Sequence, residues 1–111
     1  MKFIETEYFR QQLDKLKGKY FKIQNDYREF KGDFDIDFAV ELWRGLYKQR
    51  WKNSSIPTGK RWWLRFIIKV YNGLALPILI YAKTIKRNVS EDEIISALEI
   101  TLKELQKMNI W

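Results

Sequence analysis

Basic side chains fall at alternate positions in the middle of this chain, at Lys48, Arg50 and Lys52. Two more, Arg65 and Lys69, lie four residues apart on a later segment. Alternate residues of a strand point to the same side, so each set would share one face of a sheet. Lysine and arginine bind phosphate oxygens, and such a face would suit a polyanion such as nucleic acid.

The positive charge extends well beyond these five residues. From Leu42 to Ser90 the chain carries eleven lysines and arginines and no acid, whereas the rest holds ten lysines and arginines and fourteen acids. The alternative is an ordinary solvated face, but such a face usually interleaves both signs of charge. The segregation therefore favours a surface that meets a polyanion.

A second basic group, Lys60 and Arg61, directly precedes Trp62 and Trp63. Aromatic rings beside cations suit single-stranded RNA, because bases stack on the rings while phosphates pair with the charges. Neighbouring strand residues point in opposite directions, so we expect at least one of the tryptophans in the core. The residues expected to contact RNA are Lys52, Lys60, Arg61, Trp62, Lys69 and Arg87.

The composition argues against metal and thiol chemistry. The chain has no histidine and no cysteine, which removes the commonest zinc ligands. Asp33, Asp35 and Asp37 alternate as in a calcium loop, but Phe38 and Arg44 stand where that loop needs glycine and glutamate. No acid lies within the basic stretch to hold an ion. We therefore expect neither a metal nor another cofactor.

Turn signals divide the basic stretch into strands. The turn formers of 53–59 and the pair Asn72-Gly73, a strong hairpin signal, separate apolar runs. An antiparallel meander is predicted. Its strands are expected at Leu46–Lys52, Trp62–Tyr71 and Ala75–Lys83.

The N-terminal third has a helical pattern. Apolar residues recur every three or four positions over Phe9–Phe30, with Gly18 as a joint between two helices. Alternation over Phe34–Leu42 favours an extended segment, with a short helix as the alternative.

A further helix is predicted over about Glu91–Met108, because Ser90 and Glu93 have the spacing of a capping box. At 111 residues and 46% apolar composition, residues 1–111 are expected to form a single domain. The predicted fold class is α+β, with the N-terminal helices and the C-terminal helix packed on one face of a small antiparallel sheet. The other face would then be an open cationic surface.

Three local sequences, together with the order of elements, carry a resemblance to a known family. They are Gly45–Arg50, Gly59–Arg61 leading into Leu64–Ile68, and Ile80–Ser90 running into the acidic helix start. With these features the chain resembles the RelE/ParE superfamily of bacterial toxins from type II toxin–antitoxin systems, nearest to its RelE-like and HigB-like members. The likeness covers most of the chain and is clearest over Gly45–Glu93.

The resemblance implies an activity. RelE-like members are endoribonucleases, or mRNA interferases, that cleave mRNA in the ribosomal A site without metal, by attack of a ribose 2′-hydroxyl on the neighbouring phosphate. By resemblance, Lys48, Arg50 and Arg65 line the cleavage site, and Lys83 and Lys86 lie near a further basic position of the family. Such a cluster can transfer a proton and hold the extra negative charge on phosphorus.

The resemblance also implies partners and leaves alternatives. A cognate antitoxin would neutralise the protein, and the ribosome and mRNA would be its targets, so that translation and growth stop. ParE-like members poison DNA gyrase instead, and a non-catalytic RNA-binding module is a further alternative. The tyrosine that RelE-like members carry after the last strand has no clear counterpart among Val89, Ser90 and Glu91. Without a signal peptide or a membrane span, a soluble cytoplasmic protein is expected.

Overall fold

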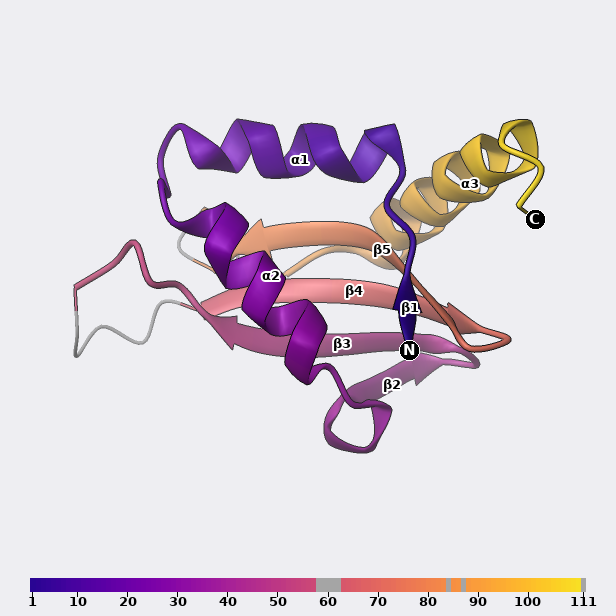
Figure 1. Cartoon of the computed structure of the whole chain (residues 1–111), viewed down its shortest axis with the longest axis horizontal. Helices are drawn as coiled ribbons and strands as arrows, with labels where there is room; N and C mark the ends of the chain where they lie inside the picture. Colours follow the sequence, from indigo (N-terminus) through magenta and orange to yellow (C-terminus); the bar gives the residue numbers. More distant parts are fainter. Residues whose placement is uncertain (58–62, 84, 87, 111) are drawn as a thin grey trace.

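The computed structural model describes residues 1–57, 63–83, 85–86 and 88–110. Within these residues, three α-helices and a five-stranded sheet form an α+β fold (Figure 1), which confirms the predicted class. The helices are α1 (Glu7–Lys17), α2 (Ile23–Asp33) and α3 (Glu91–Lys107), with a short 3-10 helix, η1, at Ile36–Phe38. The strands are β1 (Lys2–Phe3), β2 (Val40–Trp43), β3 (Leu46–Lys52), β4 (Trp63–Tyr71) and β5 (Leu74–Ala82).

The sheet has the strand order β1-β5-β4-β3-β2. Strands β2 to β5 are antiparallel neighbours, so the predicted meander is confirmed and gains β2 at its edge. Asn72 and Gly73 have φ values of 49° and 77°, as a two-residue hairpin turn requires. The sheet is mixed and not purely antiparallel, because β1 pairs parallel with β5. Strand β1 was not predicted, because two residues are too few to show an alternating pattern in a sequence.

Helices α1 and α2 cover one face of the sheet. They form the first of two apolar clusters, in which the ring of Phe30 stacks on that of Phe66 with centroids 4.0 Å apart. Gly18 caps the C-terminal end of α1, in agreement with the predicted joint. The apolar residues that meet in this cluster include Phe9, Leu13, Ile23, Tyr27 and Phe30 from the helices and Leu64, Phe66 and Ile68 from β4.

Helix α3 lies on the opposite face, and this corrects the predicted placement of all helices on one face. Ile67 alternates with Phe66 and Ile68, so it points away from α1 and α2. It belongs to the second apolar cluster, which it shares with Ile94 and Ala97 of α3. A strand that is apolar on both faces has to be covered on both.

The segment after α2 combines the two predicted alternatives. Its first part forms η1, where the Asp35 side chain accepts a hydrogen bond of 2.9 Å from the Asp37 amide. Within this segment, only Val40–Trp43 forms a strand.

The predicted capping box of α3 is present, with reciprocal 3.2 Å hydrogen bonds between Ser90 and Glu93. Among the described residues, no helix is both long and apolar enough to cross a membrane.

Candidate functional site

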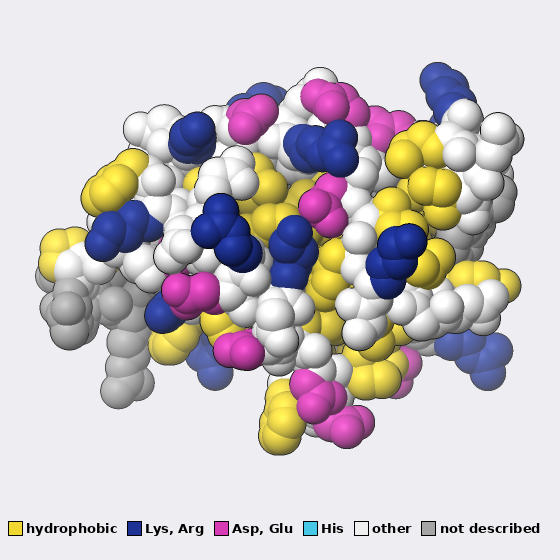
Figure 2. All heavy atoms as spheres, in the orientation of Figure 1, with side chains coloured by type: hydrophobic (Ala, Val, Ile, Leu, Met, Phe, Trp, Pro, Cys, Tyr) yellow, Lys and Arg dark blue, Asp and Glu magenta, His cyan; other side chains and the backbone are white. Residues whose placement is uncertain are grey.

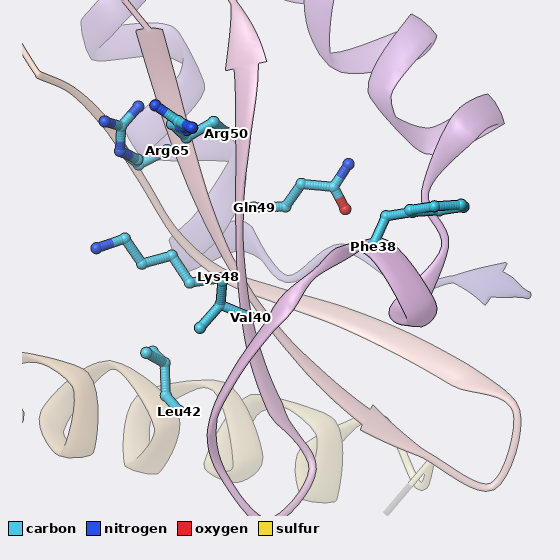
Figure 3. Close-up of a pocket in the computed structure, with 7 residues that line it drawn as sticks. All are labelled: Phe38, Val40, Leu42, Lys48, Gln49, Arg50 and Arg65. Carbon is cyan, nitrogen blue, oxygen red and sulfur yellow. The ribbon is translucent and has the colours of Figure 1, made fainter.

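A cavity of about 470 Å³ opens beside β3 at the point where β2 begins. The pairing of β2 with β3 runs only as far as Val40 opposite Lys48, so β2 leaves the rest of the β3 edge uncovered. We call this opening the notch. Its lining residues are Phe38, Val40, Leu42, Lys48, Gln49, Arg50 and Arg65 (Figure 3).

The notch brings three of the predicted site residues together. Lys48 and Arg50 lie on the same face of β3, and Arg65 of β4 stands directly opposite Arg50 in the strand register. Figure 3 shows the two guanidinium groups close together, with Lys48 on the same side of β3. Like charges at directly opposed positions destabilise a sheet, so this arrangement favours a bound anion.

Arg65 is buried, which corrects the expectation that it lies on an open surface. Only 6% of the residue is exposed. Its Nη1 atom has no hydrogen-bond partner within the part of the chain that the structure describes. Burial, and secondly the charge of Arg50, lower the pKa of Arg65. Nη1 of Arg65 is therefore a buried donor without an acceptor among the described residues.

Tyr81 extends this arrangement to a third strand and was not among the predicted site residues. It stands opposite Arg65 in the β4–β5 register, so Arg50, Arg65 and Tyr81 form a row across β3, β4 and β5. Tyr81 is 7% exposed, and its hydroxyl likewise has no partner among the described residues. Burial raises the pKa of Tyr81, while the charge of Arg65 opposes the shift. The hydroxyl thus stays protonated near neutral pH and is available as a donor.

Trp63 lies beside Arg50 on this face. The guanidinium carbon of Arg50 is 5.7 Å from the centroid of the Trp63 ring, a distance typical of a cation–π contact. Trp63 is half-buried and belongs to neither apolar cluster of the described residues. The ring positions Arg50, and the expectation of a core tryptophan is not met at this position.

Two other predicted RNA-binding residues are held by neighbouring elements. Lys52 forms a 3.0 Å ion pair with Glu29 of α2, and the hydrogen bond to Glu29 raises the pKa of Lys52. The Nζ atom of Lys69 donates a 3.3 Å hydrogen bond to the carbonyl of Arg44 in the turn between β2 and β3. Neither residue lines the notch.

The remaining predicted residues follow β5 or precede β4 in the sequence. Lys83 is exposed, and Lys86 forms an ion pair with Glu93 at the start of α3; neither lines the notch. The other four fall outside the described residues. They are Lys60, Arg61, Trp62 and Arg87.

The face covered by α1 and α2 has a different charge pattern. Figure 2 shows lysines and arginines interleaved with acids on this face. Lys31 pairs with Glu5 at 3.5 Å, and Arg10 approaches Glu7 at 4.0 Å. The described residues contain no group of three or more acids that could hold a metal ion.

No protein-family model and no curated protein matches this chain.

Proposed function

We propose that this protein is a RelE-like toxin of a type II toxin–antitoxin system, a cytoplasmic, ribosome-dependent mRNA endonuclease that works without metal. The observation that carries this proposal is the row of Arg50, Arg65 and Tyr81 with Lys48 beside it. Two members of the row, Arg65 and Tyr81, are buried donors without partners among the described residues. An RNA phosphate supplies the acceptors that both lack.

The proposed reaction is an internal transfer at phosphorus. The 2′-oxygen attacks the neighbouring phosphate and the bond from phosphorus to the 5′-oxygen breaks, which leaves a cyclic 2′,3′-phosphate and a 5′-hydroxyl. Arg50 and Arg65 hold the extra negative charge of the transition state, and Tyr81 donates a hydrogen bond to a phosphate oxygen. Lys48 provides the proton that the leaving oxygen takes up, and the proton of the 2′-hydroxyl passes to water.

The partner is proposed from the same charges. An antitoxin segment that is acidic and partly apolar would place carboxylates near Lys48 and Arg50 and exclude RNA from the notch. Crosslinking of the complex tests this mode. Contacts confined to 53–59, with the notch left open, would contradict it.

Induced expression in bacteria tests the proposed function. Wild-type protein should arrest growth, and primer extension should show new cuts within mRNA coding sequences. Lys48→Ala, Arg50→Ala and Arg65→Met should each relieve the arrest, whereas Lys15→Ala, at an exposed position of α1, should not. Co-expression of the protein encoded by the adjacent gene should restore growth.

Two results would overturn the proposal. One is full toxicity of a variant that lacks all three cations of the notch. The other is inhibition of DNA gyrase in a supercoiling assay without any cut in mRNA, which would assign the protein to the ParE-like alternative. Circular dichroism of each variant confirms that loss of toxicity is not loss of fold.

A further inference from the structure

The notch has a second half that a phosphate does not use. Phe38 is apolar, yet it is 82% exposed. Beside it lies Gln49, whose Oε1 atom is buried and has no hydrogen-bond partner among the described residues. An exposed aromatic ring and an unpaired buried acceptor in one cavity indicate a ligand that is both planar and able to donate a hydrogen bond.

The geometry connects this half of the notch to the phosphate half. Gln49 directly precedes Arg50 on β3, so its side chain points to the other side of the strand. Figure 3 shows Gln49 extending toward Phe38, while Lys48, Arg50 and Arg65 lie on the opposite side of β3. Because β2 leaves the β3 edge at Lys48, one opening reaches both sides. A ligand with an anionic part and a planar part can therefore occupy both halves together.

We infer that Phe38 and Gln49 form a base-binding subsite for single-stranded RNA, next to the phosphate held by the three cations. One base adjoining that phosphate stacks on Phe38. Its edge donates an N–H group to Gln49 Oε1 and can accept from the amide nitrogen. Bases of a duplex are stacked and paired, so the subsite selects unpaired RNA. This inference deepens the proposed function and rests on it.

A protein partner is the competing occupant of an exposed apolar side chain such as Phe38. Two features favour a base. The unpaired Gln49 acceptor lies in the same cavity as Phe38, and a cluster of three cations adjoins it. An apolar anchor of a protein would leave the Gln49 acceptor unsatisfied, whereas a base edge satisfies it.

Binding of short oligonucleotides tests the subsite. The probe is a single-stranded RNA whose riboses carry 2′-O-methyl groups, which prevent cleavage, and a matched series has one abasic position at a time. For wild-type protein, one abasic position should weaken binding about tenfold, as expected for the loss of one stacked base. For Phe38→Leu and for Gln49→Leu, the fully based RNA should bind more weakly and the penalty at that abasic position should largely disappear.

The control is Phe21→Leu, because Phe21 is 72% exposed and lies in the turn between α1 and α2, outside the notch. Its binding and its abasic penalty should equal those of wild type, and Phe38→Tyr should retain both. Equal binding of every abasic probe, or an unchanged penalty in Phe38→Leu, overturns the subsite alone and assigns Phe38 to a protein. Failure of wild type to bind any of the RNAs overturns the subsite and the proposed function together.

Discussion

Arg65 is charged and buried, and its Nη1 atom has no partner among the described residues. An arginine in an interior normally forms an ion pair, because an unpaired buried charge is costly. Here its register neighbours are a second arginine and a tyrosine, Arg50 and Tyr81. Such a residue weakens the free protein and strengthens the complex with an anion, so stability and activity should respond to its replacement in opposite directions.

Arg65→Met tests this opposition. Methionine keeps most of the volume of the side chain and removes its charge, so the free energy of unfolding should rise by about 1–3 kcal/mol. Cleavage of mRNA should be lost. Denaturant unfolding of the variant, with Arg50→Met as an exposed control, measures the effect. A loss of stability of similar size would show that Arg65 has a stabilising partner in the free protein.

Tyr81→Phe separates the hydroxyl from the ring. The hydroxyl is buried and has no partner among the described residues, so the melting temperature at neutral pH should not fall. RNA affinity should fall about tenfold, the effect of one lost hydrogen bond to a charged group. Tyr47→Phe, on the other face of the sheet, is the control. A variant with full affinity would remove Tyr81 from the site.

The raised pKa of Tyr81 also predicts how stability depends on pH. The folded protein retains this proton at pH values where the unfolded chain, with a pKa near 10.0, has lost it. The resulting stabilisation is complete below pH 10 and disappears as the pH rises through the folded pKa. Wild type should therefore lose more unfolding free energy above pH 10 than Tyr81→Phe does, and equal losses would contradict the assignment.

At the scale of elements, the register of β5 explains why Tyr81 was not predicted. The Asn72-Gly73 turn pairs Tyr71 with Leu74, and an unbroken ladder would place Ile80 opposite Arg65. An irregularity at Pro77 and Ile78 adds one residue, so every later side chain of β5 changes face. Proline cannot donate to the ladder and marks such positions, but its presence alone does not reveal a bulge.

A feature of the sequence could have predicted which face of the sheet α3 covers. The strand bounds and the capping box follow from local turn and cap chemistry, and the structure confirms them within one or two residues. The amphipathic pattern of α3 shows only that one stripe is buried, not against which face. The apolar run Phe66–Ile68 indicates a strand that is covered on both sides. That cover also explains why the cationic surface is a notch and not an open face.

Helix α3 also contacts α1 through hydrogen bonds, and their contribution to stability should be measurable. The Glu104 carboxylate accepts hydrogen bonds from the amides of Glu7 at 2.8 Å and Tyr8 at 3.1 Å, so it caps the first turn of α1. Glu104→Ala should lower the free energy of unfolding by about 1 kcal/mol, typical of a lost cap. Glu99→Ala, at an exposed position of α3, should have little effect. Equal effects of the two changes would show that the cap adds nothing.

At the scale of the whole molecule, opposite charges are interleaved on the helical face and segregated at the notch. RNA affinity should therefore fall steeply as salt rises, since phosphate contacts release counterions. Lys48→Ala should reduce the slope of log affinity against log salt by about 0.7, the value for one contact with a single strand. Lys15→Ala should leave the slope unchanged. A wild-type affinity independent of salt would contradict a polyanion site.

The central claim is that mRNA is cleaved at the notch by attack of a 2′-hydroxyl of the mRNA itself. Single-turnover cleavage on purified ribosomes tests it most directly, with an mRNA that carries one 2′-deoxyribose at the cut position. Wild-type protein should cut the unmodified mRNA to a cyclic 2′,3′-phosphate and a 5′-hydroxyl, and the rate should fall by about 10²–10⁴ when Lys48 is replaced by alanine. It should not cut the deoxy-substituted mRNA at that position. Cleavage of both mRNAs at the same rate, or products with a 5′-phosphate, would contradict the account.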